Sequence, residues 1–171
     1  MIRQGVPVEN KSVNSDPATT IRALLTTQVQ CVLSTIDEDA PNQHLMAFAP
    51  EPSLTDVYIA SQRATRKVAN LLRHPAVSLL WDNRTGNTRD HVQGLAVTAQ
   101  GQASLLNGWA RARVEHLLLA RNPELATLLS GNEAAVFALR IQSYRLVQGY
   151  DSVTAFIPGG VSELPRASLS A

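Results

Sequence analysis

Apolar and polar residues alternate along much of the chain with the period of two that marks half-buried β-strands. Residues 95–105 show this alternation most clearly, and Gly101 within them predicts a bulge or bend. Shorter runs predict the other strands, at 31–36, 44–49, 57–61, 76–81, 135–141 and 143–150. The polar stretches 37–41 and 51–56 predict the turns between the first three strands.

Three segments instead have the helical period of 3.6 residues. Asp16-Pro17 predicts the start of a first helix, because Asp can cap free N–H groups and Pro suits the first helical position. Residues 63–73 predict a second helix, which His74-Pro75 would end. Ala64, Val68, Leu71 and Leu72 would form its apolar face, opposite Arg63, Lys67 and Asn70. A third helix would begin after Asn107, with Arg111 and Glu115 paired on one face, and a short helix would follow Asn122-Pro123.

The order of these elements favours one β-rich domain. Consecutive strands joined by short turns pair antiparallel, and six or seven such strands favour a closed or nearly closed barrel, since closure removes exposed edges. The predicted domain covers residues 16–156. An N-terminal arm at 1–15 and a loose C-terminal tail at 157–171, rich in Pro, Gly and Ser, flank it.

Composition narrows the class of protein. The chain has 171 residues, 44% hydrophobic and 17% charged, as in an ordinary globular domain. A net charge of +1 provides no broad basic field, so we expect no nucleic-acid partner. With a single cysteine, Cys31, no membrane-length apolar run and no signal-peptide pattern, we expect a cytoplasmic location.

Candidate chemistry concentrates in the segment SQRATRK at 61–67. Ser61, Thr65, Arg66 and Lys67 cluster where a predicted strand leads into a predicted helix. The free N–H groups and dipole of a helix start favour an anion, and hydroxyl and cationic side chains add donors, so a phosphate monoester suits this point. The alternative is an ordinary basic, solvated helix face.

The stretch ATRKVANLLRHPAVSLLW at 64–81 resembles the phosphate-binding helix and following strand of the pyridoxamine 5′-phosphate oxidase-like, FMN-binding family. The resemblance extends over about residues 20–106, and the preceding hairpin and the strand with Gly101 fall in order. It implies a mainly β (α+β) fold, a six-stranded antiparallel split β-barrel with Greek-key connections and peripheral helices. It also implies FMN as cofactor, bound between the two subunits of a homodimer, and an oxidoreductase acting on a small organic substrate.

Carried onto this sequence, the resemblance implies two groups of cofactor-binding residues. Arg66 and Lys67 would bind the FMN phosphate, with hydroxyl hydrogen bonds from Ser61 or Thr65. The strand residues along the isoalloxazine ring would be Gln43, His44, Leu45, Met46 and Ala47. Asn70 would either assist at the phosphate or be an exposed helix residue.

The sequence also departs from the family pattern. Gln43 or His44 replaces an arginine, Ala96 replaces a flavin-contacting glutamine, and the substrate-binding C-terminal ending is missing. These differences argue against pyridoxamine phosphate as the substrate and leave catalytic residues unassigned. A deazaflavin or haem in the same fold, and a non-catalytic flavin-binding or sensor protein, stay as alternatives. Haem would need His44 or His91 as an axial ligand.

Other residues have competing interpretations. The four histidines lack metal-ligand spacing, so we expect no protein metal site. Asp90-His91 is either a proton relay or a surface loop feature, and Cys31 is expected to be a small buried hydrophobe. Trp81 and Trp109 would anchor the core or a dimer interface. Tyr150 and Phe156 would cover the flavin from the partner or pack the C-terminal arm.

Overall fold

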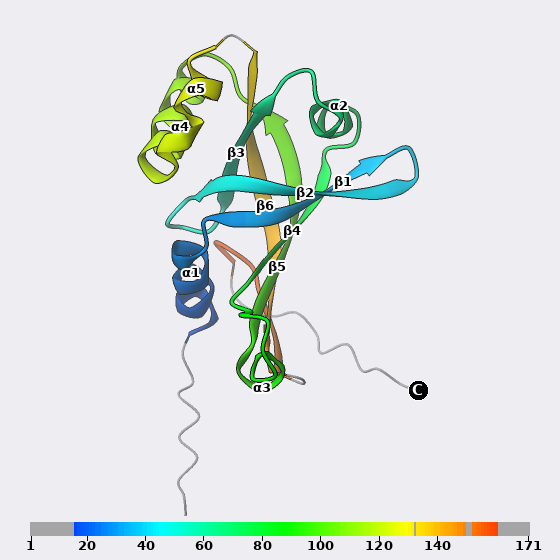
Figure 1. Ribbon diagram of the computed structural model, residues 1–171, viewed down its shortest axis with the longest axis vertical. Coiled ribbons are helices and arrows are strands. Elements are labelled where there is room, and N and C mark those ends of the chain that lie inside the picture. Colours follow the sequence, from blue (N-terminus) through cyan, green and yellow to red (C-terminus); the bar gives the residue numbers. More distant parts are fainter. Residues whose placement is uncertain (1–15, 132, 150–151, 161–171) are drawn as a thin grey trace, which may run out of the picture.

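Six antiparallel strands form a closed barrel in the computed structural model, which describes residues 16–131, 133–149 and 152–160 (Figure 1). The strand order is β3-β2-β1-β4-β5-β6-β7, and an additional pairing of β3 with β6 closes the ring. The predicted mainly β, six-stranded barrel is therefore confirmed. A seventh strand, β7, continues the sheet beyond β6.

The strands follow the alternating pattern closely. Their bounds are β1 Gln30–Asp37, β2 Ala40–Pro50, β3 Asp56–Gln62, β4 Ala76–Asp82, β5 Leu95–Leu105, β6 Ala134–Gln148 and β7 Ser152–Phe156. Their inward side chains form one apolar core, in which Phe48 meets Trp81 edge-to-face at 5.5 Å between ring centroids. Both rings are almost fully buried, so Trp81 is a core residue.

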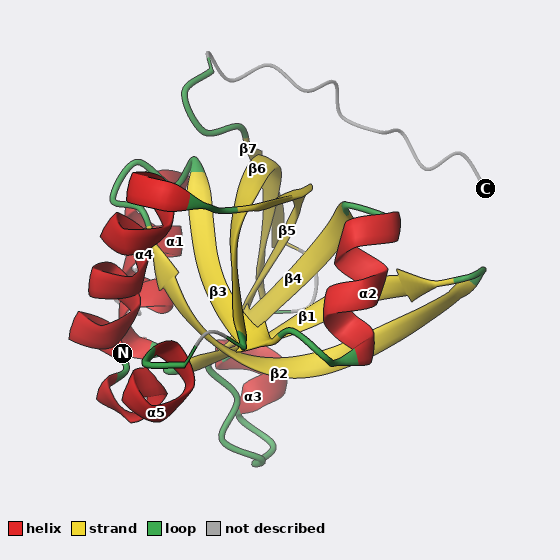
Figure 2. Cartoon of the chain, turned by 90° about the horizontal axis from the view of Figure 1, so that it is seen from above, coloured by secondary structure: helices red, strands yellow, loops and turns green. Residues whose placement is uncertain are grey.

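The helices lie outside the barrel (Figure 2). α1 Pro17–Thr27 starts as predicted, since the Asp16 carboxylate accepts a hydrogen bond from the Thr19 N–H. α4 Gly108–Arg121, the 3₁₀ turn η1 Pro123–Leu125 and α5 Ala126–Leu129 lie on one side of the barrel, and α2 Arg66–Arg73 lies on the other. None of the helices in the described ranges is long and apolar enough to cross a membrane.

The two strands predicted at the end of the domain are wrong, because they form the single strand β6. A bulge explains the error: Gln100 pairs with Ser143 and Gly101 with Ile141, so Gln142 is an extra residue that breaks the alternation. A Cβ on Gly101 would lie 2.4 Å from the Arg140 carbonyl oxygen, so the close approach of the two strands requires glycine. The predicted bulge at Gly101 is confirmed.

The second predicted helix also differs. α2 begins at Arg66 rather than Arg63, and Leu72 is 57% exposed, so it does not belong to the apolar face. Asn70 occupies the buried face with Val68 and Leu71. Asp90–Gln93 form a single helical turn, α3, so Asp90 and His91 belong to a short helix.

Candidate cofactor-binding groove

Most of β2 has one free edge. Its residues 40–47 pair with β1, but β3 pairs only with residues 48–50, so the outer edge of 40–47 has no strand neighbour among the described residues. The backbone N–H and C=O groups along such an edge can bind a polar ring edge. β3 diverges from β2 here because it pairs with β6 along its whole length.

A groove of about 470 Å³ occupies this divergence. Its lining includes six of the nine predicted site residues, from both β2 and the β3–α2 connection. The lining residues are Gln30, Leu45, Met46, Ala47, Ala60, Ser61, Gln62, Thr65, Lys67, Leu125 and Leu128. The wall is largely apolar along β2 and along η1 and α5, and polar at the start of α2. This combination suits a flat apolar ring that carries an anionic tail.

The start of α2 forms the polar end of the groove. Thr65 is the N-cap residue, and its carbonyl accepts hydrogen bonds from the Val68 and Ala69 N–H groups. The N–H groups of Arg66 and Lys67, in the first turn, have no helical carbonyl to bind. This turn contains no acidic residue. The helix dipole and the two free N–H groups therefore favour an anion at this end.

Two hydroxyl groups lie beneath this helix start. The Thr65 hydroxyl donates to the Gln62 carbonyl oxygen at 2.8 Å, and Ser61 Oγ lies 3.2 Å from Thr65 Oγ1. Because the Thr65 proton is already used, Ser61 is the donor between them. Ser61 is almost fully buried, and rotation of its hydroxyl proton toward the groove is the simplest way for this pair to donate to a ligand.

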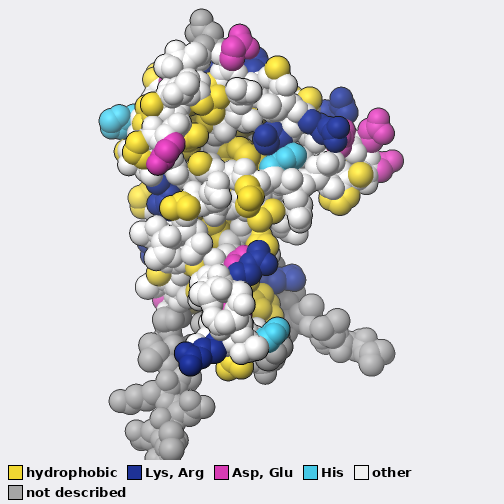
Figure 3. Space-filling model, in the orientation of Figure 1, with side chains coloured by type: hydrophobic (Ala, Val, Ile, Leu, Met, Phe, Trp, Pro, Cys, Tyr) yellow, Lys and Arg dark blue, Asp and Glu magenta, His cyan; other side chains and the backbone are white. Residues whose placement is uncertain are grey.

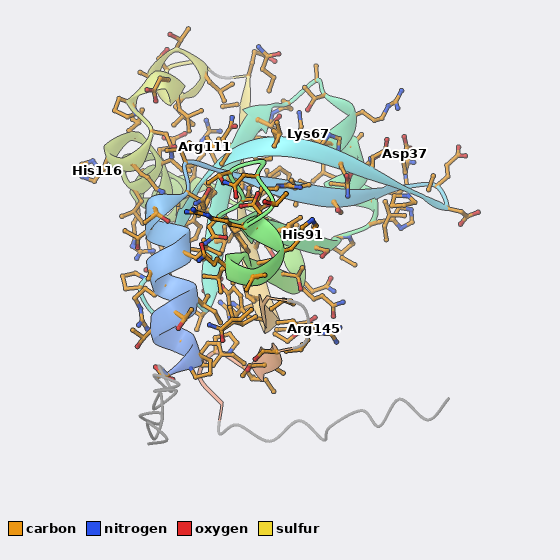
Figure 4. All side chains as sticks on the ribbon, turned by 60° about the horizontal axis from the view of Figure 1, so that its bottom comes forward. Asp37, Lys67, His91, Arg111, His116 and Arg145 are labelled. Carbon is orange, nitrogen blue, oxygen red and sulfur yellow. The ribbon has the colours of Figure 1, made fainter. Side chains whose placement is uncertain are left out.

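The two basic side chains differ in their pairing. Arg66 Nε lies 3.6 Å from Asp37 Oδ2, and both side chains are partly exposed. Lys67 forms no ion pair within the described part of the chain, and Figure 4 shows it beside β2, apart from Asp37. In Figure 3, basic side chains gather around α2, and acidic ones mark the tip of the β1–β2 hairpin. Lys67 is therefore the cation that is free to bind a ligand in the groove.

His44, Gln43 and Arg66 are not among the lining residues of the groove. Gln43 lies on the exposed face of β2 with Leu45, whereas His44 lies on the opposite, inward face. His44 Nε2 is 3.0 Å from the Thr35 hydroxyl. Burial, followed by the charges of Lys67 and Arg66, lowers the pKa of His44, so the imidazole is held neutral beside these cations.

The sequence interpretation missed the residues around His44 and the far wall of the groove. Thr35 and Asn70 are each 1% exposed, and Asn70 Nδ2 donates to Thr35 Oγ1 at 3.1 Å. Asn70 is thus neither a phosphate contact nor an exposed residue. Leu125 and Leu128 come from a segment more than 50 residues beyond the end of α2. Their contribution depends on tertiary packing, although the polar position of Thr35 in an otherwise apolar stripe was a visible signal.

The remaining candidates lie elsewhere. Asp90 accepts hydrogen bonds from the N–H groups of Thr85, Gly86 and Asn87, which makes it the centre of a loop. Cys31 is buried in β1, as predicted, and burial raises the pKa of its thiol to about 12. Trp109 is 82% exposed and does not anchor the core.

Phe156 packs against Tyr144, with 6.1 Å between ring centroids, and Tyr150 lies outside the described residues. The described residues contain no group of three or more His, Cys, Asp or Glu side chains placed to hold a metal ion.

Comparison with known proteins agrees with this architecture. Residues 18–147 match the family described as pyridoxamine 5′-phosphate oxidase, and the chain therefore belongs to that family. None of the curated proteins matches the chain.

Solved structures show the same fold at low identity. A haem-binding protein from Mycobacterium smegmatis superposes with a TM-score of 0.74 at 18% identity, covering 84% of this chain and 58% of that one. The haem storage protein HutZ from Vibrio cholerae has a TM-score of 0.63 at 19% identity, covering 82% and 94%. General Stress Protein 26 from Bacillus anthracis has a TM-score of 0.61 at 18% identity, covering 81% and 98%. This chain thus spans little more than half of the mycobacterial protein.

Proposed function

We propose that this protein binds FMN in the groove between β2 and α2 and acts as a flavin-dependent oxidoreductase on a small organic substrate. One observation carries the proposal: the groove joins the free edge and apolar wall of β2 to an unpaired lysine and a helix start. A flavin with a phosphate tail has the complementary chemistry, an apolar ring with a polar edge and a dianionic end.

The residues at each end have distinct roles in this proposal. Lys67 and the N–H groups at the start of α2 bind the phosphate, Arg66 adds charge from the rim, and Ser61 donates through its hydroxyl. Met46 and Ala47 form the wall for the ring, and the free backbone edge of β2 binds the polar ring atoms. When bound, FMN supplies two-electron redox chemistry, and the protein orients it and shields it from water.

The donor set favours FMN over the other cofactors of this fold. Haem needs an axial ligand, but the groove lining within the described residues contains no histidine, and His44 Nε2 is already bonded to Thr35. The haem-binding proteins above are therefore evidence for the fold alone. A deazaflavin carries a longer acidic tail, and among the described residues that line the groove Lys67 is the one that is charged.

We further propose that a homodimer completes the site. Leu45 in the groove is 69% exposed, and Trp109 at the start of α4 is 82% exposed. Large apolar side chains exposed to this degree are typical of surfaces that bury on association. Sedimentation of the purified protein tests this point: a dimer is expected at micromolar concentration, and a monomer that binds FMN fully would contradict a shared site.

The first experiment compares FMN with riboflavin, which has the same ring without the phosphate. Purified protein is titrated with each ligand, following the absorption and fluorescence of the flavin. We expect saturable FMN binding and riboflavin binding weaker by about 100-fold or more, since two or three charge-assisted hydrogen bonds would be lost. Equal affinities would overturn the phosphate site, and no binding of either ligand would overturn the flavin assignment.

A bound flavin then allows the catalytic part of the proposal to be tested. The holoprotein is mixed with NADH or NADPH without oxygen, and bleaching of the flavin absorbance is followed. Rapid reduction, followed by reoxidation with a small organic acceptor, is the expected result for an oxidoreductase. Tight binding of FMN without reduction by a broad set of donors would instead support the non-catalytic, sensor-like alternative.

A further inference from the structure

Three polar side chains are linked by hydrogen bonds where α2 packs against the barrel. They come from three elements: Thr35 from β1, His44 from β2 and Asn70 from α2. Thr35 continues the inward stripe of Cys31 and Leu33, and Asn70 shares its helix face with Val68 and Leu71. At these positions the pattern of each element would otherwise call for an apolar residue.

Burying Thr35 and Asn70 is tolerable because they bond to each other and, through Thr35, to the half-buried His44. Asn70 Nδ2 donates to Thr35 Oγ1 at 3.1 Å, and Thr35 Oγ1 lies 3.0 Å from His44 Nε2. Apolar side chains of similar shape at these positions would leave the protein about as stable, since replacing both partners of a buried hydrogen bond is nearly neutral. The polar set therefore calls for an explanation beyond stability.

The geometry determines the direction of each hydrogen bond. An amide nitrogen can only donate, so Thr35 Oγ1 accepts from Asn70. The Thr35 hydroxyl has one proton, and His44 Nε2 is its single remaining partner within the described residues. If His44 donated to Thr35 instead, the Thr35 hydroxyl proton would be buried without an acceptor, because Thr35 is 1% exposed.

It follows that Nε2 of His44 is the acceptor and Nδ1 carries the hydrogen. The charged groups near the ring agree with a neutral imidazole: Lys67 and Arg66 of α2 both repel a proton. Asp37 of β1 pairs with Arg66, with 3.6 Å between Asp37 Oδ2 and Arg66 Nε.

We propose that Asn70 and Thr35 form a hydrogen-bond relay that holds His44 as the neutral Nδ1–H imidazole and thereby fixes β2, the ring wall, relative to α2, the phosphate end. The proposal rests on the proposed FMN site and deepens it. Asn70, Thr35 and His44 are positioning residues, because none of them lines the groove. Their function is to set the distance between β2, which would contact the flavin ring, and the start of α2, which would bind the phosphate.

Side-chain ¹H–¹⁵N correlation spectra of the ligand-free protein test the relay without any cofactor. The His44 signal is assigned by its loss in His44→Gln. The expected spectrum shows an unprotonated Nε2 and a protonated Nδ1. A wild-type spectrum with hydrogen on Nε2 would overturn the relay.

The most informative substitution is that of Asn70 by aspartate. Its carboxylate has the shape of the asparagine amide but can only accept hydrogen bonds. In Asn70→Asp, Thr35 must donate to position 70 and accept from His44, so the hydrogen is expected to move to Nε2. An unchanged tautomer would contradict the proposal. In case Asn70→Asp does not fold, Thr35→Val breaks the relay without adding a charge, and it should leave His44 as a mixture of tautomers.

The positioning role is tested by FMN affinity. We expect Thr35→Val to weaken binding by about tenfold or more, because both buried hydrogen bonds of the Thr35 hydroxyl are lost, and Thr35→Ser to restore it. Wild-type affinity in Thr35→Val would overturn the positioning role. If the wild-type protein bound no FMN, the proposed function would fail, whereas the spectra would still decide the existence of the relay.

Discussion

Polar segments at the two ends of the barrel use their hydrogen-bonding groups differently. At the end that carries α3, residues 83–94 bond largely to themselves: Asp90 binds three backbone N–H groups, and Asn83 Oδ1 binds the Leu95 N–H at 2.7 Å. Arg84 pairs with Asp82 at 2.8 Å. This end also has a hollow of about 260 Å³, but the polar side chains that line it already have partners: Arg84 pairs with Asp82, and Asn83 and Asp90 accept hydrogen bonds from backbone N–H groups.

The end that carries α2 keeps its donors available. Lys67 has no ion pair among the described residues, the N–H groups of Arg66 and Lys67 lack helical acceptors, and one edge of β2 is open. In the sequence the two segments look alike, since both are polar, contain arginine and follow a strand. Unused hydrogen-bond donors, rather than polarity itself, therefore distinguish a candidate binding site from a self-contained loop.

The largest difference in FMN affinity is expected between a variant that loses two positive charges at the α2 end and one that loses two at the α3 end. In the double variant Arg66→Ala/Lys67→Ala, we expect FMN affinity to fall by about 100-fold or more, because two charge-assisted contacts to the phosphate are lost. The matched control is Arg84→Ala/Arg89→Ala, which removes the same charge at the opposite end and should bind FMN like the wild type. Flavin titration measures both, and full flavin retention in the first variant would refute the placement.

Loss of the buried hydroxyl should have a smaller effect. Ser61→Ala is expected to weaken FMN binding by about tenfold, the lower limit for the loss of one hydrogen bond to a charged group. Ser104→Ala, at an exposed position of β5, provides the control for a serine remote from the groove. If both variants bound FMN equally well, the hydroxyl pair would have no part in the site.

At the other end, Asp90 should control loop order but not cofactor affinity. The N–H groups of Thr85, Gly86 and Asn87 lower the pKa of Asp90. Its stabilising contribution is therefore complete above its unfolded pKa, about 3.9, and disappears as the pH falls through the lower folded value. Amide exchange of residues 85–87 should become faster in Asp90→Asn at neutral pH, with FMN affinity unchanged. Weaker FMN binding in this variant would show that the two ends are coupled.

The smallest effect is expected when a thiol reagent is added to the native protein, because Cys31 is buried in the core of the barrel. Because burial raises the pKa of Cys31 to about 12, the native thiol should not react with a thiol reagent at pH 8. Denatured protein should react completely, which supplies the control. Fast labelling of the native protein would mean that the β1–β2 region opens, and the contrast between a rigid core and an available groove would then need revision.

Much of the barrel could be predicted from local patterns. Alternation along β5, the capping of α1 by Asp16 and the stop at His74-Pro75 depend on neighbouring residues, and each prediction is confirmed. β6 was divided in two because the bulge at Gln142 shifts the alternation by one residue, and only the pairing with β5 shows that the strand continues. Leu72 was misplaced because helical period alone does not decide which side of a short helix meets the barrel.

The candidate site divides in the same way. Residue chemistry at 61–67 was sufficient to suggest an anion at a helix start, because capping residues, hydroxyls and cations act over a few positions of the chain. The groove itself depends on the divergence of β3 from β2 and on Leu125 and Leu128. The partners of Thr35 lie 9 and 35 residues away. Hydrogen bonds and apolar contacts act through space, so the same residues acquire these roles only when the barrel closes.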